Sequence, residues 1–362
     1  MRVAYTIEQC WHRVPGGTAV AAVETARALM EGAGIEPIGV AARHSSPPRP
    51  PYAPPMAVHH LPLPRFALYE AWHYLRRPVV ERATGPVDAI HATTIAIPPR
   101  SAPLIVTIHD LAFVHDPTHF TARGLRFFRR GLDLALKDAD MIVCPSEATA
   151  RDCIAAGFER DRVAVVPMGV SSEPASEGEI ERVRRHYSLD RPYVMWTGTI
   201  EPRKNLARLL VAYRSLGVDL DLVLVGPKGW NQDLDSLVGE DRARIKVLGF
   251  VPQTDLGPLY AGATVFCFPS LLEGFGFPVL EAMAQGTPVV TSGRTSTEEL
   301  ARDAGLLVDP TDPDDIARGV RSVLEDDALA RRLRDAGRAR SATYTWERTA
   351  ELMAACYEKV AG

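Results

Sequence analysis

Short apolar runs rich in β-branched residues alternate with helical patterns along almost the whole chain of 362 residues. Most residues of each run are apolar, which is typical of a strand that is buried on both faces of a parallel sheet. The runs fall into two series. The first comprises 2–7, 37–42, 89–92, 104–109, 141–144 and 163–167, and the second comprises 193–198, 222–226, 245–249, 265–269, 288–292 and 305–309.

Amphipathic helical patterns lie between these runs, for example at 18–30, 125–136 and 206–216. Strands that alternate with helices predict an α/β protein, and two series predict two doubly wound, Rossmann-like domains. The chain is long enough for two hydrophobic cores.

We expect an N-terminal domain over 1–170 and a C-terminal domain over 171–344. The small, polar segment 169–179 would form the boundary between them. The tail, 345–362, predicts one more helix, which is able to pack back on the N-terminal domain.

Composition narrows the function classes. A formal charge of −4 excludes a generally basic nucleic-acid-binding protein. The five cysteines form no CxxC pair, which favours reduced core thiols. The N-terminus lacks the pattern of a signal peptide, and no apolar run approaches the ~20 residues of a membrane span. We therefore expect a soluble cytoplasmic protein.

Residues 43–58 contain six prolines, and we expect this segment to stay outside the sheets. Two interpretations are equally open. The segment is either a mobile loop at the mouth of a binding site or a surface connection with no role.

The segment TGTIEPRKNL (197–206) places Arg203 and Lys204 after a strand end and at the start of a helix. Ligands of open α/β sheets lie beyond the carboxyl ends of strands, and helix N-termini favour phosphate. Two adjacent cations there would suit a diphosphate. An isolated Arg-Lys pair is more often a pair of solvated surface charges.

The segment EGFGFPVLEAMAQGTPVVTS (273–292) holds two glutamates eight positions apart. Pro278 predicts the first turn of a helix and Gly286 its end, which places Glu281 in the first turn and Glu273 in the loop before it. Ionised carboxylates only accept hydrogen bonds, so neighbouring sugar hydroxyls are natural partners. The alternative is that Glu281 complements the helix dipole and Glu273 lies on the surface.

Two further segments of the second domain carry weaker signals. The segment LGFVPQTDLGPLY (248–260) is a strand end and turn whose backbone would suit the edge of a base. The segment TSTEELARDAGLLVDPTDP (295–313) predicts a capped helix and a strand with a structural role.

Taken together, these motifs resemble the retaining glycosyltransferases of family 4, which have the GT-B fold of two Rossmann-like domains facing across a cleft. The resemblance rests on the PRKN at 202–205 and the two glutamates within EGFGFPVLEAMAQGTPVV. The segments PGGTAVAAVETARALM, CPSEATARD and VVPMGV also have counterparts in the family. One departure is Thr199, where many members carry an arginine after the strand-end glycine.

The resemblance implies a role for each matching residue of the second domain. Arg203 and Lys204 would bind the donor diphosphate and stabilise the leaving group. Glu273 would contact the transferred sugar and Glu281 the ribose, while the backbone at Val251, Gly276 and Phe277 would line the rest of the donor site.

In the first domain, Gly16 and Gly17 come before a helix that we expect to begin at Thr18. No GxGxxG is present, so the dinucleotide fingerprint fails. The resemblance assigns the two glycines to the donor, and a plain tight turn is the alternative. His109 ends the strand 104–109, and the resemblance places it at the anomeric carbon. His115 and His119 lack the spacing of a zinc site, so we expect no metal.

The segment 121–136 groups Arg123, Arg126, Arg129 and Arg130 with Phe127 and Phe128. This pattern favours an ordinary amphipathic helix with a solvated basic face. A surface that contacts a membrane or an acceptor is the alternative.

The sequence therefore predicts a retaining, metal-independent hexosyltransferase that needs no cofactor beyond its nucleotide-sugar donor. GDP-mannose is the favoured donor, with UDP-glucose and UDP-N-acetylglucosamine as alternatives. The acceptor would be a glycan, a lipid-linked saccharide or a small molecule, and the enzyme would be cytoplasmic, with peripheral attachment to the inner membrane face left open. The rival functions are a nucleotide-sugar 2-epimerase of the same fold and a non-catalytic sugar-nucleotide-binding protein.

Overall fold

The computed structural model describes residues 1–170, 173–227, 229, 234–239 and 241–362. The chain divides into two compact units. Unit 1 contains Met1–Gly169 and Thr345–Gly362, and unit 2 contains Val170–Tyr344. Ser171 and Ser172, within the expected boundary segment, lie outside the described residues. No helix formed by the described residues has the length and apolar character that crossing a bilayer requires.

Unit 1 is built on a parallel sheet in the order β3-β2-β1-β4-β5-β6-β7. The strands are β1 (Arg2–Thr6), β2 (Glu36–Ala41), β3 (Val58–His60), β4 (Ala89–Ala92), β5 (Leu104–Thr107), β6 (Met141–Cys144) and β7 (Val163–Val165). The central strands β4, β5 and β6 are buried along their whole length, which explains why they are apolar except for His91 and Thr107.

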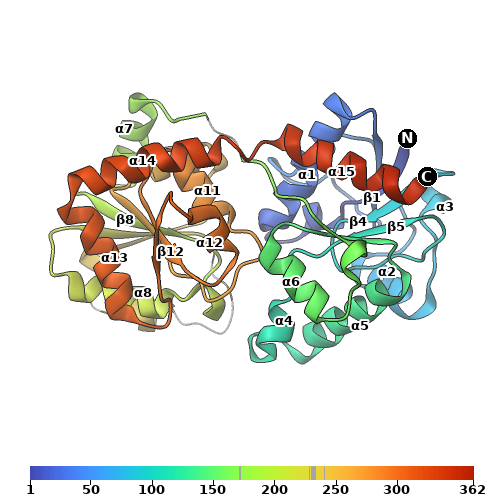
Figure 1. Cartoon of the computed structure of the whole chain (residues 1–362), viewed down its shortest axis with the longest axis horizontal. Helices are drawn as coiled ribbons and strands as arrows, with labels where there is room; N and C mark the ends of the chain where they lie inside the picture. The colour runs from blue at the N-terminus through green and yellow to red at the C-terminus, as the bar shows by residue number, and fades with distance from the viewer. Residues whose placement is uncertain (171–172, 228, 230–233, 240) are drawn as a thin grey trace. The chain divides into compact units, whose positions relative to one another are not determined.

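Helices cover both faces of this sheet (Figure 1). On one face, α1 (Gly16–Gly32) and α15 (Trp346–Ala361) pack side by side over Val3, Ile105 and Met141. The opposite face carries α2 (Arg65–Glu70), the π-helix η2 (Ala71–Leu75), α5 (Ala122–Asp138) and α6 (Glu147–Ala155). The short helices of the unit are η1 (Glu8–Trp11), α3 (Glu81–Thr84), α4 (Ala112–His115), η3 (Pro117–His119) and η4 (Arg160–Arg162).

Unit 2 has a parallel sheet in the order β10-β9-β8-β11-β12-β13. The strands are β8 (Tyr193–Thr197), β9 (Asp221–Val225), β10 (Ile245–Gly249), β11 (Val265–Phe268), β12 (Val289–Ser292) and β13 (Leu306–Val308). The helices are α7 (Glu177–His186), η5 (Pro202–Lys204), α8 (Leu206–Leu216), α9 (Leu234–Val238), η6 (Asp241–Ala243), α10 (Gln253–Ala261), α11 (Phe277–Ala284), α12 (Ser296–Ala301), α13 (Pro313–Glu325) and α14 (Asp327–Ser341).

The prediction of two doubly wound α/β units is confirmed. One strand was missed, because the expectation that 43–58 stays outside the sheets is wrong at its last residue. Val58 pairs with Gly39 and begins the edge strand β3. This strand is hard to recognise in the sequence, because two of its residues are histidines and it follows a proline-rich segment. All five cysteines are free and buried, as their apolar surroundings indicated.

Candidate active site

The strand order of unit 2 reverses direction between β8 and β11, which lie side by side at the centre of the sheet. The chain continues from β8 to β9 and β10 on one side, and from β11 to β12 and β13 on the other. Such a switch point leaves room for a ligand beyond the carboxyl ends of the two strands. The loops that follow β8 and β11 carry Arg203, Lys204 and Glu273.

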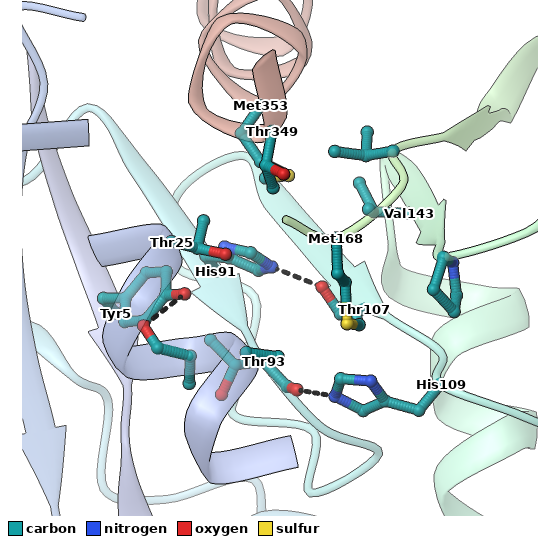
Figure 2. A pocket seen from close by; sticks show the side chains of 14 residues that line it. Tyr5, Thr25, His91, Thr93, Thr107, His109, Val143, Met168, Thr349 and Met353 are labelled. Atoms are coloured by element: carbon teal, nitrogen blue, oxygen red, sulfur yellow. Dashed lines mark hydrogen bonds between the residues drawn. The ribbon is translucent and has the colours of Figure 1, made fainter. Parts of the chain in front are cut away.

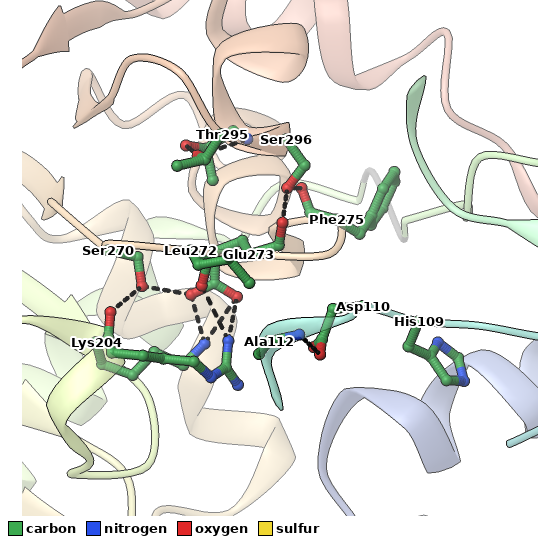
Figure 3. Close-up of polar contacts among 12 residues, drawn as sticks. His109, Asp110, Ala112, Lys204, Ser270, Leu272, Glu273, Phe275, Thr295 and Ser296 are labelled. Carbon is green, nitrogen blue, oxygen red and sulfur yellow. Dashed lines mark hydrogen bonds and ion pairs between the residues drawn. The ribbon is translucent and has the colours of Figure 1, made fainter. Parts of the chain in front are cut away.

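Arg203 and Lys204 form one ionic cluster with Glu273, which lies 70 and 69 positions away from them in sequence. The Lys204 Nζ donates to Glu273 Oε1 at 2.7 Å and to Oε2 at 2.9 Å, and Arg203 donates to Oε2 at 3.2 Å. Ser270 adds a hydrogen bond to the same carboxylate (Figure 3). Arg203 also pairs with Glu201 at 2.9 Å. The structure therefore brings Arg203, Lys204 and Glu273 into direct contact, and their role in donor binding stays a prediction.

The cluster is largely withdrawn from water, since Lys204 and Glu273 are each only 9% exposed. Burial acts to raise the pKa of the Glu273 carboxyl, but Lys204, Arg203 and the Ser270 hydroxyl outweigh it and hold the pKa below its usual value. Burial and the neighbouring Arg203 lower the pKa of Lys204. Glu273 therefore stays ionised, and its charge offsets the cost of a buried ammonium group.

A backbone turn presents the two cations. Arg203 and Lys204 lie in η5 and not at the start of α8, which is where the sequence placed them. Asn205 follows in the left-handed conformation with φ 58°. Its side-chain amide donates to the carbonyls of Pro269 at 2.8 Å and Pro310 at 2.7 Å. Asn205 thus ties the β8 loop to the β11 loop and fixes the position of the neighbouring cations.

The glycine-rich loop leads directly into α11. Gly276 is the residue before the helix and has φ 106°, where the Cβ of any other residue would also approach the side chain of Thr297. Phe277 is the first residue of the helix, and Pro278 lies in the first turn as predicted. The Ser296 hydroxyl of α12 donates to the carbonyls of Glu273 at 2.8 Å and Phe275 at 3.0 Å. The segment 295–313, predicted to be structural, therefore shapes this loop.

Glu281 belongs to a second hydrogen-bonded group. It lies in the second turn of α11, so its placement in the first turn was wrong and it cannot complement the helix dipole there. The Tyr260 hydroxyl donates to Glu281 Oε2 at 2.8 Å, and the same hydroxyl lies 2.9 Å from the Thr197 Oγ1. Burial raises the pKa of Glu281, and Tyr260 counteracts part of that shift. This carboxylate has no ion pair among the contacts of the described residues.

Val251 lies two residues beyond the end of β10 and is buried, while the preceding Phe250 is 66% exposed. This is the third loop at the carboxyl edge of the unit 2 sheet. The expected binding role of Val251 stays a prediction, since the side chain is apolar and any contact with a donor would come from its backbone.

In unit 1, the two glycines lie inside the first turn of α1 and not before it. The helix begins at Gly16, so the expected start at Thr18 was wrong by two residues. Gly16 has φ 64°, a conformation that residues with a side chain rarely adopt. A Cβ at Gly16 would meet no atom within 4 Å. The backbone conformation, and not crowding, therefore requires glycine here.

His109 lies beyond the strand that it was predicted to end, because β5 stops at Thr107. Its Nε2 lies 3.0 Å from the carbonyl oxygen of Thr93, and burial lowers the pKa of its imidazole. A neutral His109 therefore donates from Nε2 to Thr93. Thr93 is itself fixed by hydrogen bonds with Thr6 and with Gln9, whose amide donates at 2.8 Å.

His91 belongs to a second hydrogen-bonded group, which lines the same small cavity as His109 and Thr93 (Figure 2). Its ring nitrogens lie 2.7 Å from the Tyr357 hydroxyl of α15 and 2.7 Å from the Thr107 hydroxyl. Burial lowers its pKa to about 3, with a contribution from His109. The cavity between these side chains measures about 30 Å³, which is too small for a sugar and enough for a water molecule.

His115 and His119 have carboxylate partners, Asp152 at 2.7 Å and Asp116 at 3.3 Å. The described residues contain no group of three or more His, Cys, Asp or Glu side chains placed to hold a metal ion. These histidines thus make local contacts with carboxylates.

Several polar residues of these hydrogen-bonded groups were not predicted from sequence. They include Ser270, Tyr260 and Thr197 in unit 2, and Thr6, Gln9, His91, Thr93, Thr107 and Tyr357 in unit 1. Ser270 has a local signal, because it precedes Glu273 by three positions in the loop after an apolar strand. Tyr260 has none, since only the packing of α10 against α11 brings it to Glu281.

Comparison with known proteins agrees with this architecture. The family model Glycosyltransferase Family 4 matches residues 15–173, and the model Glycosyl transferases group 1 matches residues 179–340. Together the two models match most of the chain.

One curated relative is the O-antigen chain mannosyltransferase B of Escherichia coli, which is 35% identical over 71% of this chain and 70% of its own length. Another is the serotype-specific mannosyltransferase WbdA of Escherichia coli, 30% identical over 72% of this chain. The matched part spans only 34% of WbdA, about a third of that protein.

Among solved structures, HepE of Anabaena in complex with UDP-glucose matches with a TM-score of 0.78. Sequence identity is 19%, over 99% of this chain and 100% of HepE, so this likeness concerns the fold. With both family models matched and a relative at 35% identity, the chain belongs to glycosyltransferase family 4 and has the GT-B fold.

Proposed function

We propose that this glycosyltransferase moves mannose from GDP-mannose to a glycan, lipid-linked or small-molecule acceptor, with retention of configuration and without a metal ion. The observation that carries the donor site is the buried cluster of Arg203, Lys204 and Glu273 at the switch point of unit 2. The similarity to mannosyltransferases supports the choice of sugar.

Arg203 and Lys204 have the charge and position to bind a diphosphate. A diphosphate at this edge would compete with Glu273 for the same two cations, because phosphate oxygens and carboxylate oxygens accept the same hydrogen bonds. As the bond between sugar and phosphate breaks, negative charge grows on the leaving group. Fixed cations out of water stabilise that charge more strongly than solvent does.

Glu273 and Glu281 would hold opposite ends of the donor. Displaced from part of its cation contacts, Glu273 accepts hydrogen bonds from hydroxyls of the transferred sugar. Glu281 gives one oxygen to Tyr260 and keeps acceptor capacity on the other for the ribose hydroxyls. The backbone at Val251, Gly276 and Phe277 would line the remainder of the donor site.

Unit 1 supports the sugar with neutral groups. His109, uncharged because of its lowered pKa, offers an imidazole to a sugar hydroxyl without adding positive charge beside a developing oxocarbenium ion. The positive φ of Gly16 and the adjacent Gly17 would bring backbone close to the donor. For retention we propose a same-face displacement, in which the departing phosphate takes the acceptor proton and no side chain forms a covalent bond to the sugar.

A donor panel tests this proposal and its rivals. The enzyme is incubated with GDP-mannose, UDP-glucose and UDP-N-acetylglucosamine, first alone and then with pools of glycan and lipid-linked acceptors. Transfer that depends on acceptor, prefers GDP-mannose and gives an α-linked product by NMR supports the proposal. Conversion of donor alone to its 2-epimer would show an epimerase. Donor binding without any turnover across the panel would favour a non-catalytic binding protein.

A further inference from the structure

A fourth charged side chain belongs to the ionic cluster of unit 2. Glu201 lies in the loop after β8, directly before η5, and its carboxylate pairs with Arg203 at 2.9 Å. It is 4% exposed, which makes it the most buried of the four charged side chains. Neither the diphosphate nor the sugar was assigned to Glu201 above. The cluster therefore contains a buried acid whose role is still open.

The backbone at Glu201 does not explain its carboxylate. The residue has φ −140° and ψ 156°, and within the described part of the chain its side chain forms no capping hydrogen bond to η5. Its carbonyl accepts from the Lys204 N–H at 3.0 Å, and the preceding Ile200 is buried and donates its N–H to the Pro227 carbonyl at 3.2 Å. The turn is thus fixed by main-chain contacts, and the carboxylate is left to act on Arg203.

The guanidinium group of Arg203 is held at both of its terminal nitrogens. Nη2 pairs with Glu201, while Nη1 donates to Glu273 Oε2 at 3.2 Å and to the Leu272 carbonyl at 3.1 Å. A guanidinium group is planar, so contacts at both ends fix its orientation as well as its position. When a diphosphate replaces Glu273 on Nη1, the contact between Nη2 and Glu201 remains and keeps Arg203 oriented toward the ligand.

The formal charges of the cluster cancel. Arg203 and Lys204 are positive, and Glu201 and Glu273 are negative. Without Glu201 the cluster would carry a net positive charge and would attract a diphosphate more strongly. The nucleoside diphosphate is also the product that must leave after transfer, and product release limits turnover in many enzymes. A carboxylate that stays beside Arg203 therefore favours release of the product.

Glu201 also affects the protonation of Lys204. Burial and Arg203 lower the pKa of Lys204, whereas Glu273 and Glu201 act to raise it. If a diphosphate moves Glu273 away from the ammonium group, Glu201 remains as a fixed negative charge of the protein near it. Glu201 thus helps Lys204 to stay charged up to a higher pH.

We propose that Glu201 is a positioning residue of the donor site, which orients Arg203 for the diphosphate and cancels one of the two positive charges that the diphosphate meets. This inference rests on the proposed function, because it takes the cluster to be the diphosphate site. Glu201 contacts neither the sugar nor the phosphates and acts through Arg203 and Lys204. The alternative is a purely structural role, in which Glu201 only compensates a partly buried guanidinium group.

Calorimetric binding of GDP and UDP separates these two roles. Glu201→Gln keeps the size of the side chain and one acceptor for Arg203 but removes the charge. At pH 6.5 it should bind the nucleoside diphosphate that the wild type prefers about threefold to tenfold more tightly than the wild type does. Loss of a structural partner would weaken this binding instead. Glu201→Asp retains the charge and should bind within about twofold of the wild type.

The pH dependence of kcat/KM gives a second measurement. Glu201→Gln should lose activity at a lower alkaline pH than the wild type, because Lys204 loses a neighbouring negative charge and its pKa falls further. Glu201→Asp should keep the wild-type alkaline limb. A purely structural role predicts no movement of this limb in either variant.

The matched control is Asp138→Asn in unit 1. Asp138 is also a partly buried carboxylate that pairs with an arginine, Arg76 at 2.7 Å. Asp138→Asn and Glu201→Gln should both lower the melting temperature, since each leaves a partly buried arginine without one partner. Only Glu201→Gln should change the affinity for the nucleoside diphosphate and the alkaline limb.

Lys204→Ala distinguishes failure of this inference from failure of the proposed function. If Lys204→Ala leaves the affinity for GDP and UDP unchanged, the cluster is not the diphosphate site and both proposals are wrong. If Lys204→Ala weakens binding, but Glu201→Gln fails to strengthen it or leaves the alkaline limb in place, only the role of Glu201 is overturned. An equal change of affinity in Asp138→Asn and Glu201→Gln would overturn it as well.

Discussion

The carboxyl edges of the two sheets use opposite chemistry. In unit 2, Arg203, Lys204 and Glu273 form a buried ionic cluster. In unit 1, His91 and His109 join threonine, glutamine and tyrosine side chains in a neutral network. The same doubly wound architecture therefore carries two different kinds of polar group. Unit 2 is suited to stabilise the charge of a diphosphate, and unit 1 is suited to orient hydroxyls.

The two units also differ in their histidine content. Nine of the ten histidines lie in unit 1, and only His186 lies in unit 2. Burial lowers the pKa of His73 to about 4 and that of His91 to about 3. Unit 1 thus depends on neutral imidazoles, whereas unit 2 depends on paired charges.

The largest effect is expected from a substitution in the ionic cluster of unit 2. Lys204→Ala should lower kcat/KM for transfer by at least ~100-fold, because removing one preorganised charged contact to a transition state costs about 2.7–4 kcal/mol. Steady-state kinetics with the preferred donor measure this. Lys246→Ala, which removes a lysine from β10, is the matched control and should retain activity. Near-wild-type turnover in a folded Lys204→Ala variant would refute the phosphate role.

As the pH falls, unit 1, which contains the buried neutral histidines, should lose stability at a higher pH than unit 2. His73 and His91 have folded pKa values below the ordinary 6.5, so the unfolded chain binds more protons below that pH. Their stabilising contribution is complete above about pH 6.5 and declines as pH falls, by about 1.4 kcal/mol per pH unit for each group. Hydrogen exchange at pH 7 and pH 5.5 would show this as faster opening of β4 and η2. An equal acceleration of hydrogen exchange in the sheets of both units would contradict this difference between them.

A smaller effect is expected at the Tyr260–Glu281 contact. Tyr260→Phe removes one hydrogen bond to a buried carboxylate, and should weaken binding of the nucleoside diphosphate by about threefold to tenfold. It should leave the rate of transfer from bound donor almost unchanged. Calorimetry and single-turnover kinetics separate the two. A loss of rate without a loss of affinity would place Glu281 at the sugar.

The smallest effect is expected from chelation. EDTA should leave transfer unchanged if, as proposed, Arg203 and Lys204 supply the positive charge that a divalent cation provides in other transferases. Activity that disappears with EDTA and returns with manganese or magnesium would show that the two cations are insufficient.

The fold was predictable because it follows from local pattern. Strands buried on both faces read as largely apolar runs, and amphipathic patterns mark helices, so that α8 was predicted with the correct ends. Predictions failed where the pattern weakens. The edge strand β3 contains His59 and His60, which interrupt the apolar pattern. Strand β5 stops at Thr107, the last of its residues that pairs with β6, and the sequence does not show where this pairing ends.

The site was predictable as a set of residues and not as a set of contacts. The motifs identified Arg203, Lys204 and Glu273, but the pairing of Lys204 with Glu273 depends on two loops that are far apart in sequence. The partners of Glu281 depend on three elements, since Tyr260 lies on α10 and Thr197 ends β8. Sequence spacing carries no information about such convergence.

The central claim is that Glu273 and Glu281 hold opposite ends of one nucleotide sugar. Calorimetric titration of GDP and of GDP-mannose into the wild type, Glu273→Gln and Glu281→Gln tests it most directly. Glu281→Gln should weaken the binding of both ligands. Glu273→Gln should leave GDP affinity nearly unchanged and reduce transfer by about tenfold to a hundredfold, since a hydrogen bond to a charged group contributes roughly 1.5–3 kcal/mol. Equal loss of GDP affinity in both variants, or no loss of affinity or rate in either, would contradict the claim.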